Sequence, residues 1–330
     1  MSSSFKIEVS DLSVLGRNLK RPECIICAPN GTLYVAHKGG GIMKIDASGA
    51  QTLIGGDLQV HGHEFIPNGF ALLPDRSFLI ANMGHGGGLW SLSMQGELRP
   101  YLSEVEGVPL TKANFVFNDE LGRIWLTVTT RADPLSRAMT ALGQPECNDG
   151  FVCLIDGKGP RIVADGFAFT NEARIDRLGK KFYVAETHGR RITRFDLSAA
   201  GELSGREVFT TFGYGTFADG IAFDVEDHLW VTSVVSNRLF RIAPDGSQTI
   251  VLADSKPDMI DSTERDLVDG KVTREHFYRK TGDRVMNMAS IAFGGPDMRT
   301  AYLGTLAGDT LLSFRSPVAG APLAHWKYAS

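Results

Sequence analysis

The sequence predicts an all-β fold, a six-bladed β-propeller with a divalent metal ion in its central channel. Three observations indicate this fold. A motif of a polar residue, an apolar strand, a turn and a second apolar strand recurs six times; further short strands follow each copy; and helical periodicity is nearly absent. Units of four short strands, repeated along a chain, are typical of a propeller, in which each unit forms one blade.

The six copies begin near residues 23, 68, 114, 171, 219 and 289. In chain order they read ECIICAPNGTLYVAH, NGFALLPDRSFLIAN, NFVFNDELGRIWLTV, NEARIDRLGKKFYVAE, DGIAFDVEDHLWVTS and ASIAFGGPDMRTAYLGT. Third strands such as GIMKID and RITRFDL follow, and most units add a fourth, such as QTLI or SQTIVLA. Turns rich in Gly, Asp, Asn and Pro separate these runs. A pair of β-sandwiches is the alternative, but it would not produce six copies in phase.

We therefore expect one propeller domain spanning residues 1–330. The ring needs an outer strand for its last blade. Either SFKIEV near the N-terminus or PLAHWKY near the C-terminus could supply that strand and close the ring.

The composition narrows the class of protein. With 43% hydrophobic and 22% charged residues, the 330-residue chain can bury a sizeable core. A net charge of -4 argues against a nucleic-acid partner. No long apolar run and no secretory leader pattern occur, so we expect no membrane partner and a cytoplasmic location. Cys24 and Cys27 form a C-x-x-C motif on an expected strand, which favours buried free thiols over a redox or zinc site. The sequence does not indicate an oligomeric state.

The first position of the repeat is polar in five of the six copies. Because the first strand of each propeller blade lines the channel, this column predicts an inward-pointing ring of Glu23, Asn68, Asn114, Asn171, Asp219 and Ala289. Any single Asn or Asp before a strand is more simply a turn residue. Glu is a poor turn former, however, and the recurrence favours a ring of ligands.

Two carboxylates and several amide oxygens around one axis favour a hard cation, because unpaired carboxylates would repel each other in a partly desolvated channel. The charge of -2 from Glu23 and Asp219 balances one divalent ion. Oxygen donors suit calcium best, with magnesium or manganese as alternatives. Zinc is a further alternative, although it prefers His or Cys ligands.

These residues resemble the senescence marker protein (regucalcin)/gluconolactonase family of six-bladed propellers over nearly the whole chain. The resemblance lies in Glu23 of RPECI, Asn114 of KANFVFNDELGRIW, Asn171 of FTNEARI and Asp219 of FADGIAFDVEDHLWV. It implies that these four residues hold one divalent metal, and that Lys112 contacts substrate. Phe115 and Glu172 depart from the Asn-Asp-Gly and Asn-Gly patterns that the family often carries, which leaves the substrate open.

The resemblance implies a lactonase that opens a sugar lactone or another small lactone. In that hypothesis the cation polarises the substrate carbonyl and Asp219 is the catalytic base for water attack. The alternatives are a phosphotriesterase or fluorophosphatase using the same site, and a non-catalytic propeller with a structural calcium. In each catalytic case the partner is a small molecule.

Three long connections, residues 57–67, 129–150 and 254–287, are expected to gather on the ring's face, where they would shape the pocket. Candidate substrate contacts there are Asn68, Lys112, His37, His61, His63 and Glu186. Simpler interpretations exist for two of these groups. His61 and His63 also fit a solvated loop, and Glu186 also fits an ion pair with Arg190 or Arg191.

Overall fold

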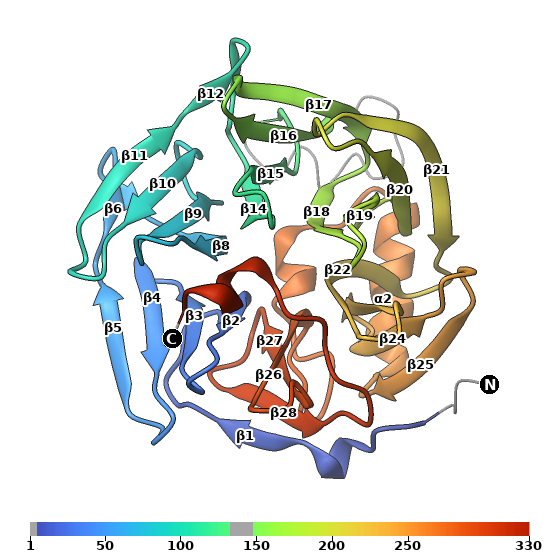
Figure 1. Cartoon of the computed structure of the whole chain (residues 1–330). Helices are drawn as coiled ribbons and strands as arrows, with labels where there is room; N and C mark the ends of the chain where they lie inside the picture. The colour runs from blue at the N-terminus through green and yellow to red at the C-terminus, as the bar shows by residue number, and fades with distance from the viewer. Residues whose placement is uncertain (1–4, 133–147, 330) are drawn as a thin grey trace.

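Six four-stranded antiparallel sheets surround a central channel in the computed structural model, which describes residues 5–132 and 148–329 (Figure 1). The sheets are β2–β5 (Ile25–Cys27, Leu33–His37, Gly41–Ile45, Gln51–Gly55), β8–β11 (Pro67–Leu72, Phe78–Asn82, Leu89–Leu92, Leu98–Leu102), β14–β17 (Ala113–Asn118, Ile124–Val128, Gly150–Asp156, Gly159–Phe167), β18–β21 (Thr170–Ile175, Lys181–Glu186, Arg191–Leu197, Leu203–Thr211), β22–β25 (Thr216–Phe223, Leu229–Val235, Arg238–Ile242, Gln248–Ala253) and β26–β28 with β1 (Met288–Gly294, Thr300–Thr305, Leu311–Arg315, Ser13–Leu15). The predicted all-β six-bladed propeller is confirmed.

The N-terminal end of the chain closes the ring. Strand β1 pairs antiparallel with β28 as the outer strand of the sixth blade, with Val14 opposite Leu312. The prediction of SFKIEV or PLAHWKY for this strand was wrong in detail. The chain before β1 instead runs past the fifth blade, where the Ile7 amide donates to the Val251 carbonyl. The C-terminal segment forms a short 3-10 helix, Ala324–Lys327.

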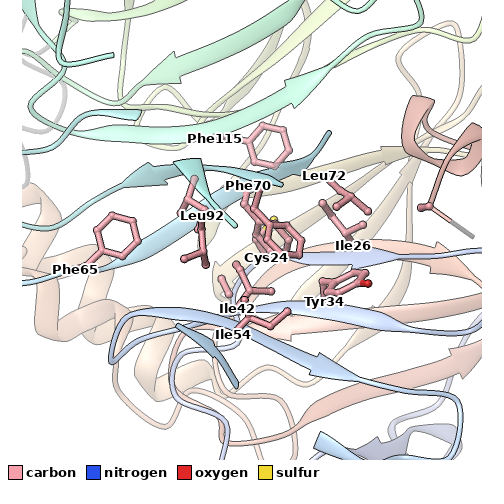
Figure 2. Packing of buried hydrophobic residues seen from close by; sticks show 14 of the residues in the cluster. Cys24, Ile26, Tyr34, Ile42, Ile54, Phe65, Phe70, Leu72, Leu92 and Phe115 are labelled. Carbon is pink, nitrogen blue, oxygen red and sulfur yellow. The ribbon is translucent and has the colours of Figure 1, made fainter. Parts of the chain in front are cut away.

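Apolar side chains fill the spaces between neighbouring blades, because the inner strands are buried on both faces. Figure 2 shows one such interface, between the first and second blades, where Ile26, Tyr34 and Ile42 face Phe70 and Leu72. Cys24 lies in the same interface, and Cys27 packs in the cluster against the sixth blade. Both cysteines are buried and free, as the sequence predicted, and burial raises the pKa of both thiols.

Two of the long connections carry structure of their own. Residues Gln59–Val60 and His63–Glu64 form a small hairpin, β6–β7, between the first and second blades. The connection from β25 to β26 contains helix α2, Pro257–Val268, and a 3-10 helix, Arg274–Phe277. This helix was not predicted from the sequence, although Pro in its first turn is a common helix start. Residues 133–147 of the third connection lie outside the described residues. No helix in the described part of the chain is long and apolar enough to span a membrane.

A buried aspartate in the turn after the inner strand ties the turn to its blade. In the fifth blade, Asp224 accepts hydrogen bonds from the indole of Trp230 and from the guanidinium of Arg241. Its other oxygen accepts two backbone amides of the turn. Asp119 repeats the arrangement in the third blade, where it accepts from Trp125 and Arg123. The Asp–x₅–Trp spacing in FNDELGRIW and FDVEDHLW therefore encodes a structural bond.

We expect Asp224→Ala to lower the free energy of unfolding by about 3–5 kcal/mol, because it leaves a buried guanidinium and indole without their partner. Asp245→Ala is the matched control. That aspartate is exposed and holds only the turn at Ser247, so its loss is expected to lower the free energy of unfolding much less than Asp224→Ala does. Urea unfolding followed by tryptophan fluorescence measures both. Equal losses for the two variants would contradict the structural role assigned to Asp224.

Candidate metal centre and active site

The polar residues at the first position of the repeat lie together in one pocket, near the beginnings of the inner strands. Its lining contains Glu23, Asn68, Asn114, Asn171 and Asp219, five of the six ring positions. All five side chains are buried, with Asn68 and Asn114 each 2% exposed. The other lining residues are Arg21, Met83, Phe169, Thr187, His188, Val234, Arg274, Phe277, Tyr278 and Leu306.

Backbone irregularities turn the ring residues into the channel. The register between inner and second strand shifts at Asn68, Asn114, Asn171, Asp219 and Ala289, the ring position of each of five blades. A bulge of this kind bends the strand and redirects a side chain that regular pleating would bury between sheets. Residues at the same position of the repeat therefore all direct their side chains toward the channel.

Two threonines orient the ring amides. Thr129 and Thr187 follow directly after the second strands of the third and fourth blades. The amide nitrogen of Asn114 donates to Thr129 at 2.9 Å, and that of Asn171 donates to Thr187 at 3.0 Å. Each threonine hydroxyl donates onward to a carbonyl of the next blade. Because the nitrogen end of each amide is held by a hydroxyl, its oxygen is left facing away from that threonine.

Two buried oxygens in this pocket lack hydrogen-bond partners among the described residues. They are Glu23 Oε2 and Asn171 Oδ1. Arg21 forms an ion pair with Glu23, but the contact does not have the geometry of a hydrogen bond to Oε2. Buried acceptors without partners are costly, and a cation would satisfy them.

The residues present fit a divalent cation bound by oxygen alone. Glu23, Asn114, Asn171 and Asp219 supply two carboxylates and two amide oxygens, the donor set typical of calcium sites. The described residues contain no cluster of three or more His, Cys, Asp or Glu arranged for a metal.

The carboxylates of the channel oppose one another. Burial and the neighbouring carboxylates of Glu23 and Glu172 raise the pKa of Asp219 well above its usual range, while Arg21 and a hydrogen bond from Asn171 act against this rise. Burial likewise raises the pKa of Glu172 to about 7, against the lowering effect of Arg174. Glu172 accepts the backbone amide of Ile221 and pairs with Arg174.

Arg21 supplies the positive charge nearest the ring. It is 8% exposed, and it adopts a left-handed backbone conformation with φ of 52°. Its guanidinium donates to Asn68 Oδ1 at 2.6 Å, to the Pro67 carbonyl at 3.1 Å and to the Tyr278 hydroxyl at 3.0 Å. Asn68 lines the pocket as predicted, but its amide is already engaged by Arg21 and by Asn114.

The remaining predicted substrate contacts are not among the residues that line this pocket. Glu186 is fully buried and accepts from Arg191, Thr193 and the Ala168 amide, which corresponds to the simpler ion-pair interpretation. His61 and His63 lie exposed on the β6–β7 hairpin. His37 and Lys112 are buried near strand ends. These five residues are therefore not part of the pocket lining.

Sequence reasoning missed Arg21, Glu172 and the three lining residues from 254–287. Glu172 follows a ring residue directly, so its place beside the site could have been inferred from the repeat. The AETHGRR motif made both Glu186 and His188 candidates for the pocket, and of these two only His188 is in the lining. Arg274, Phe277 and Tyr278 belong to a connection whose path no local pattern specifies.

A sequence model described as the SMP-30/gluconolactonase/LRE-like region matches residues 52–260, more than half of the chain. This chain belongs to the SMP-30/gluconolactonase/LRE-like family. The matched region contains three of the four predicted metal ligands, Asn114, Asn171 and Asp219, whereas Glu23 lies outside it.

Solved structures with the same fold extend over nearly the whole chain. A regucalcin from Agrobacterium tumefaciens, described as a calcium-binding protein, is 18% identical with a TM-score of 0.69, covering 97% of this chain and 98% of that one. A gluconolactonase from Xanthomonas campestris is 16% identical with a TM-score of 0.65, covering 94% and 89%. A luciferin-regenerating enzyme is 16% identical with a TM-score of 0.66, covering 94% of both chains. At these identities the likeness shows the fold, and the differing names show that fold alone does not select an activity.

Removing the hydroxyl that orients a ring amide is expected to weaken metal binding. We expect Thr187→Val or Thr129→Val to raise the Kd for calcium by about 10- to 100-fold, because the amide loses the partner that fixes its direction. Thr127→Val is the control. It deletes a buried hydroxyl in β15 that bonds the Phe115 backbone and touches no ring amide. Isothermal titration calorimetry measures all three; unchanged affinity in both test variants would contradict the assignment of Asn114 and Asn171 as ligands.

The raised pKa of Glu172 predicts a pH-dependent stability of the metal-free protein. A carboxyl whose folded-state pKa exceeds its unfolded value stabilises fully below the unfolded value and loses this contribution as the pH rises through the folded value. The pKa of Glu172 rises from the usual 4.5 to about 7, so the free energy of unfolding falls by about 3 kcal/mol over this pH range. Glu172→Gln should make this fall shallower, with the remainder carried by Asp219, whose pKa is also raised; urea unfolding in EDTA between about pH 5 and pH 8 would measure the slope. Glu202→Gln, at an exposed position, should retain the wild-type slope. A Glu172→Gln slope equal to wild type would exclude Glu172 as the titrating group.

Proposed function

We propose that this protein is a metal-dependent hydrolase that opens a lactone, with the cation held by Glu23, Asn114, Asn171 and Asp219. Membership of a family described by gluconolactonase supports this proposal. The single observation that carries it is the convergence of the Asp219 and Glu23 carboxylates with Asn171 Oδ1, a buried oxygen that has no hydrogen-bond partner among the described residues, in one pocket. Calcium is the ion that best matches an all-oxygen donor set of this kind.

When bound, the cation would supply Lewis acidity toward the carbonyl oxygen of the substrate. Asp219 would accept the proton of the attacking water; its position in the pocket lining and the burial that raises its pKa support this role. The water oxygen bonds to the carbonyl carbon, and the bond from that carbon to the ring oxygen breaks. The proton held by Asp219 then passes to the released alkoxide, so the product is a hydroxy acid.

The apolar part of the lining restricts the water that reaches the reacting groups. Phe169 and Phe277 lie on the pocket wall with Met83, Val234 and Leu306. A small lactone would bind with its ring against this apolar wall and its ester directed to the polar residues of the pocket. The same carboxylates could act on a phosphotriester, so the first experiment includes one.

The first test is hydrolysis of neutral and charged γ- and δ-lactones and an aryl phosphotriester, followed by acid release. Each is assayed after EDTA treatment and again with calcium, magnesium, manganese or zinc. We expect turnover of at least one lactone that chelation abolishes and calcium restores. Turnover of the phosphotriester alone would replace the proposal with a phosphotriesterase. Metal binding without turnover of any substrate would assign a structural ion.

Replacing the catalytic base separates chemistry from folding. Asp219→Asn should lower kcat by about 100-fold or more, the contribution of a general base. Asp219→Ala should also remove the thermal stabilisation that calcium gives the wild type, because that stabilisation depends on binding to the folded state. In the absence of metal, the Asp219→Ala protein should be as stable as wild type or more stable, since one of the opposing carboxylates is gone. An Asp219→Ala protein that bound calcium with wild-type affinity would contradict the ligand assignment.

A further inference from the structure

The connection between the fifth and sixth blades forms a fixed wall of the pocket. We call residues 254–287 the cap; it contributes Arg274, Phe277 and Tyr278 to the lining. Ile260 and Phe277 pack in one apolar cluster with Phe217 and Val234 of the fifth blade. Helix α2, labelled in Figure 1, and the following 3-10 helix both contact β23 of the fifth blade.

Polar bonds hold the cap as well. Glu264 of α2 accepts the backbone amide of Gly215 at 2.5 Å and pairs with Arg190 at 2.8 Å. Asn287 at its far end donates to the Arg279 carbonyl and accepts the Val235 amide. Because both ends and the helix are anchored, the cap side chains present a preformed surface to a substrate.

The hydroxyl of Tyr278 has a proton left to donate. It accepts hydrogen bonds from Arg21 Nε at 3.0 Å and from an Arg274 terminal nitrogen at 3.2 Å. A phenol has one donor and two acceptor positions, so these two bonds use its acceptor capacity. No acceptor of its own proton is found among the described residues. The two guanidinium groups lower the pKa of Tyr278 despite burial, which raises it, and this makes the hydroxyl a stronger donor.

Arg274 also has unused capacity, in contrast to Arg21. Arg21 bonds three acceptors and pairs with Glu23. Arg274 stacks on the Tyr278 ring at 5.5 Å and bonds only that hydroxyl. In the described part of the chain it has no ion pair with a carboxylate. A planar guanidinium with free N–H groups is suited to bind a carboxylate through two parallel hydrogen bonds.

The net charge of the pocket lining also favours an anionic ligand. Arg21 and Arg274 balance Glu23 and Asp219, so the lining carries no net charge when both carboxylates are ionised. A divalent cation would raise this to +2. Burial lowers the pKa of His188 to about 3, so this residue adds no charge near neutral pH. A pocket with an excess of two positive charges favours an anionic ligand.

We propose that the substrate is a lactone that carries a carboxylate, and that Arg274 and the Tyr278 hydroxyl bind that carboxylate. Such a lactone is the internal ester of a hydroxylated dicarboxylic acid. This inference rests on the proposed lactonase function and names its substrate class. Hydrolysis would release a dicarboxylate, whose added charge lies beside the cation.

Binding can be tested without turnover. Calcium-loaded protein is titrated calorimetrically with tetrahydrofuran-2-carboxylate, which contains the ring and carboxylate but no ester, and with the matching carboxamide. We expect the carboxylate to bind and Arg274→Gln to weaken it by about 10- to 100-fold, the value of one charged hydrogen bond. Tyr278→Phe should weaken it by a smaller factor, and Arg274→Lys should restore part of the loss. Lys280→Gln, an equal change of charge at an exposed cap position, should leave affinity within about 2-fold.

Kinetics then separate the two proposals. The substrates are 5-oxotetrahydrofuran-2-carboxylate and its carboxamide, which share the same lactone. We expect kcat/KM to favour the carboxylate by about 10-fold or more in the wild type, and Arg274→Gln to abolish that preference by slowing carboxylate hydrolysis more than carboxamide hydrolysis. Equal turnover of both by wild type would overturn the substrate class and keep the lactonase. Carboxylate binding that depends on Arg274, with no turnover of either lactone, would overturn the lactonase and keep the anion site. Binding insensitive to Arg274→Gln would overturn the anion site.

Discussion

The buried carboxylates of the channel impose the constraint on which the site depends. Glu23, Glu172 and Asp219 are each at most 7% exposed, and their mutual repulsion raises the pKa of Asp219. Arg21 and Arg174 offset part of this charge from within the protein. The rest of the offset has to come from a proton or a cation. Under the proposed function, the bound cation would supply this offset.

The ring residues owe their direction to the scaffold around them. The inner strands shift register at the ring position in five of the six blades, and two threonines hold the amides of Asn114 and Asn171. Each threonine is itself bonded to the next blade, so the orientation of one ligand is coupled to the packing of its neighbour. Closure of the ring by β1 completes this circle of contacts.

The cap adds a second, independent layer to the site. It is inserted in one connection and leaves the blades unchanged, so it can vary without disturbing the ring. Its helix is anchored by Ile260 and Glu264, and the following residues bring Arg274 and Tyr278 to the pocket. Under the proposed function, the blades would hold the metal and the cap would select the substrate.

The sequence by itself determined the repeat, and with it the propeller and the ring column. A strand pattern can be recognised from neighbouring residues alone. In a propeller, six copies in phase place the same position of each copy at one height along the channel axis. The Asp–Trp spacing and the free buried cysteines were equally local. Only the tertiary structure decided which candidates meet. Arg21, His188 and Tyr278 come from unlike segments, while Glu186, two residues from His188, turns instead toward Arg191. Side-chain direction at a strand end depends on bulges and on the neighbouring blade, and the path of a 34-residue cap depends on what it packs against. Neither is encoded in the local pattern of residues.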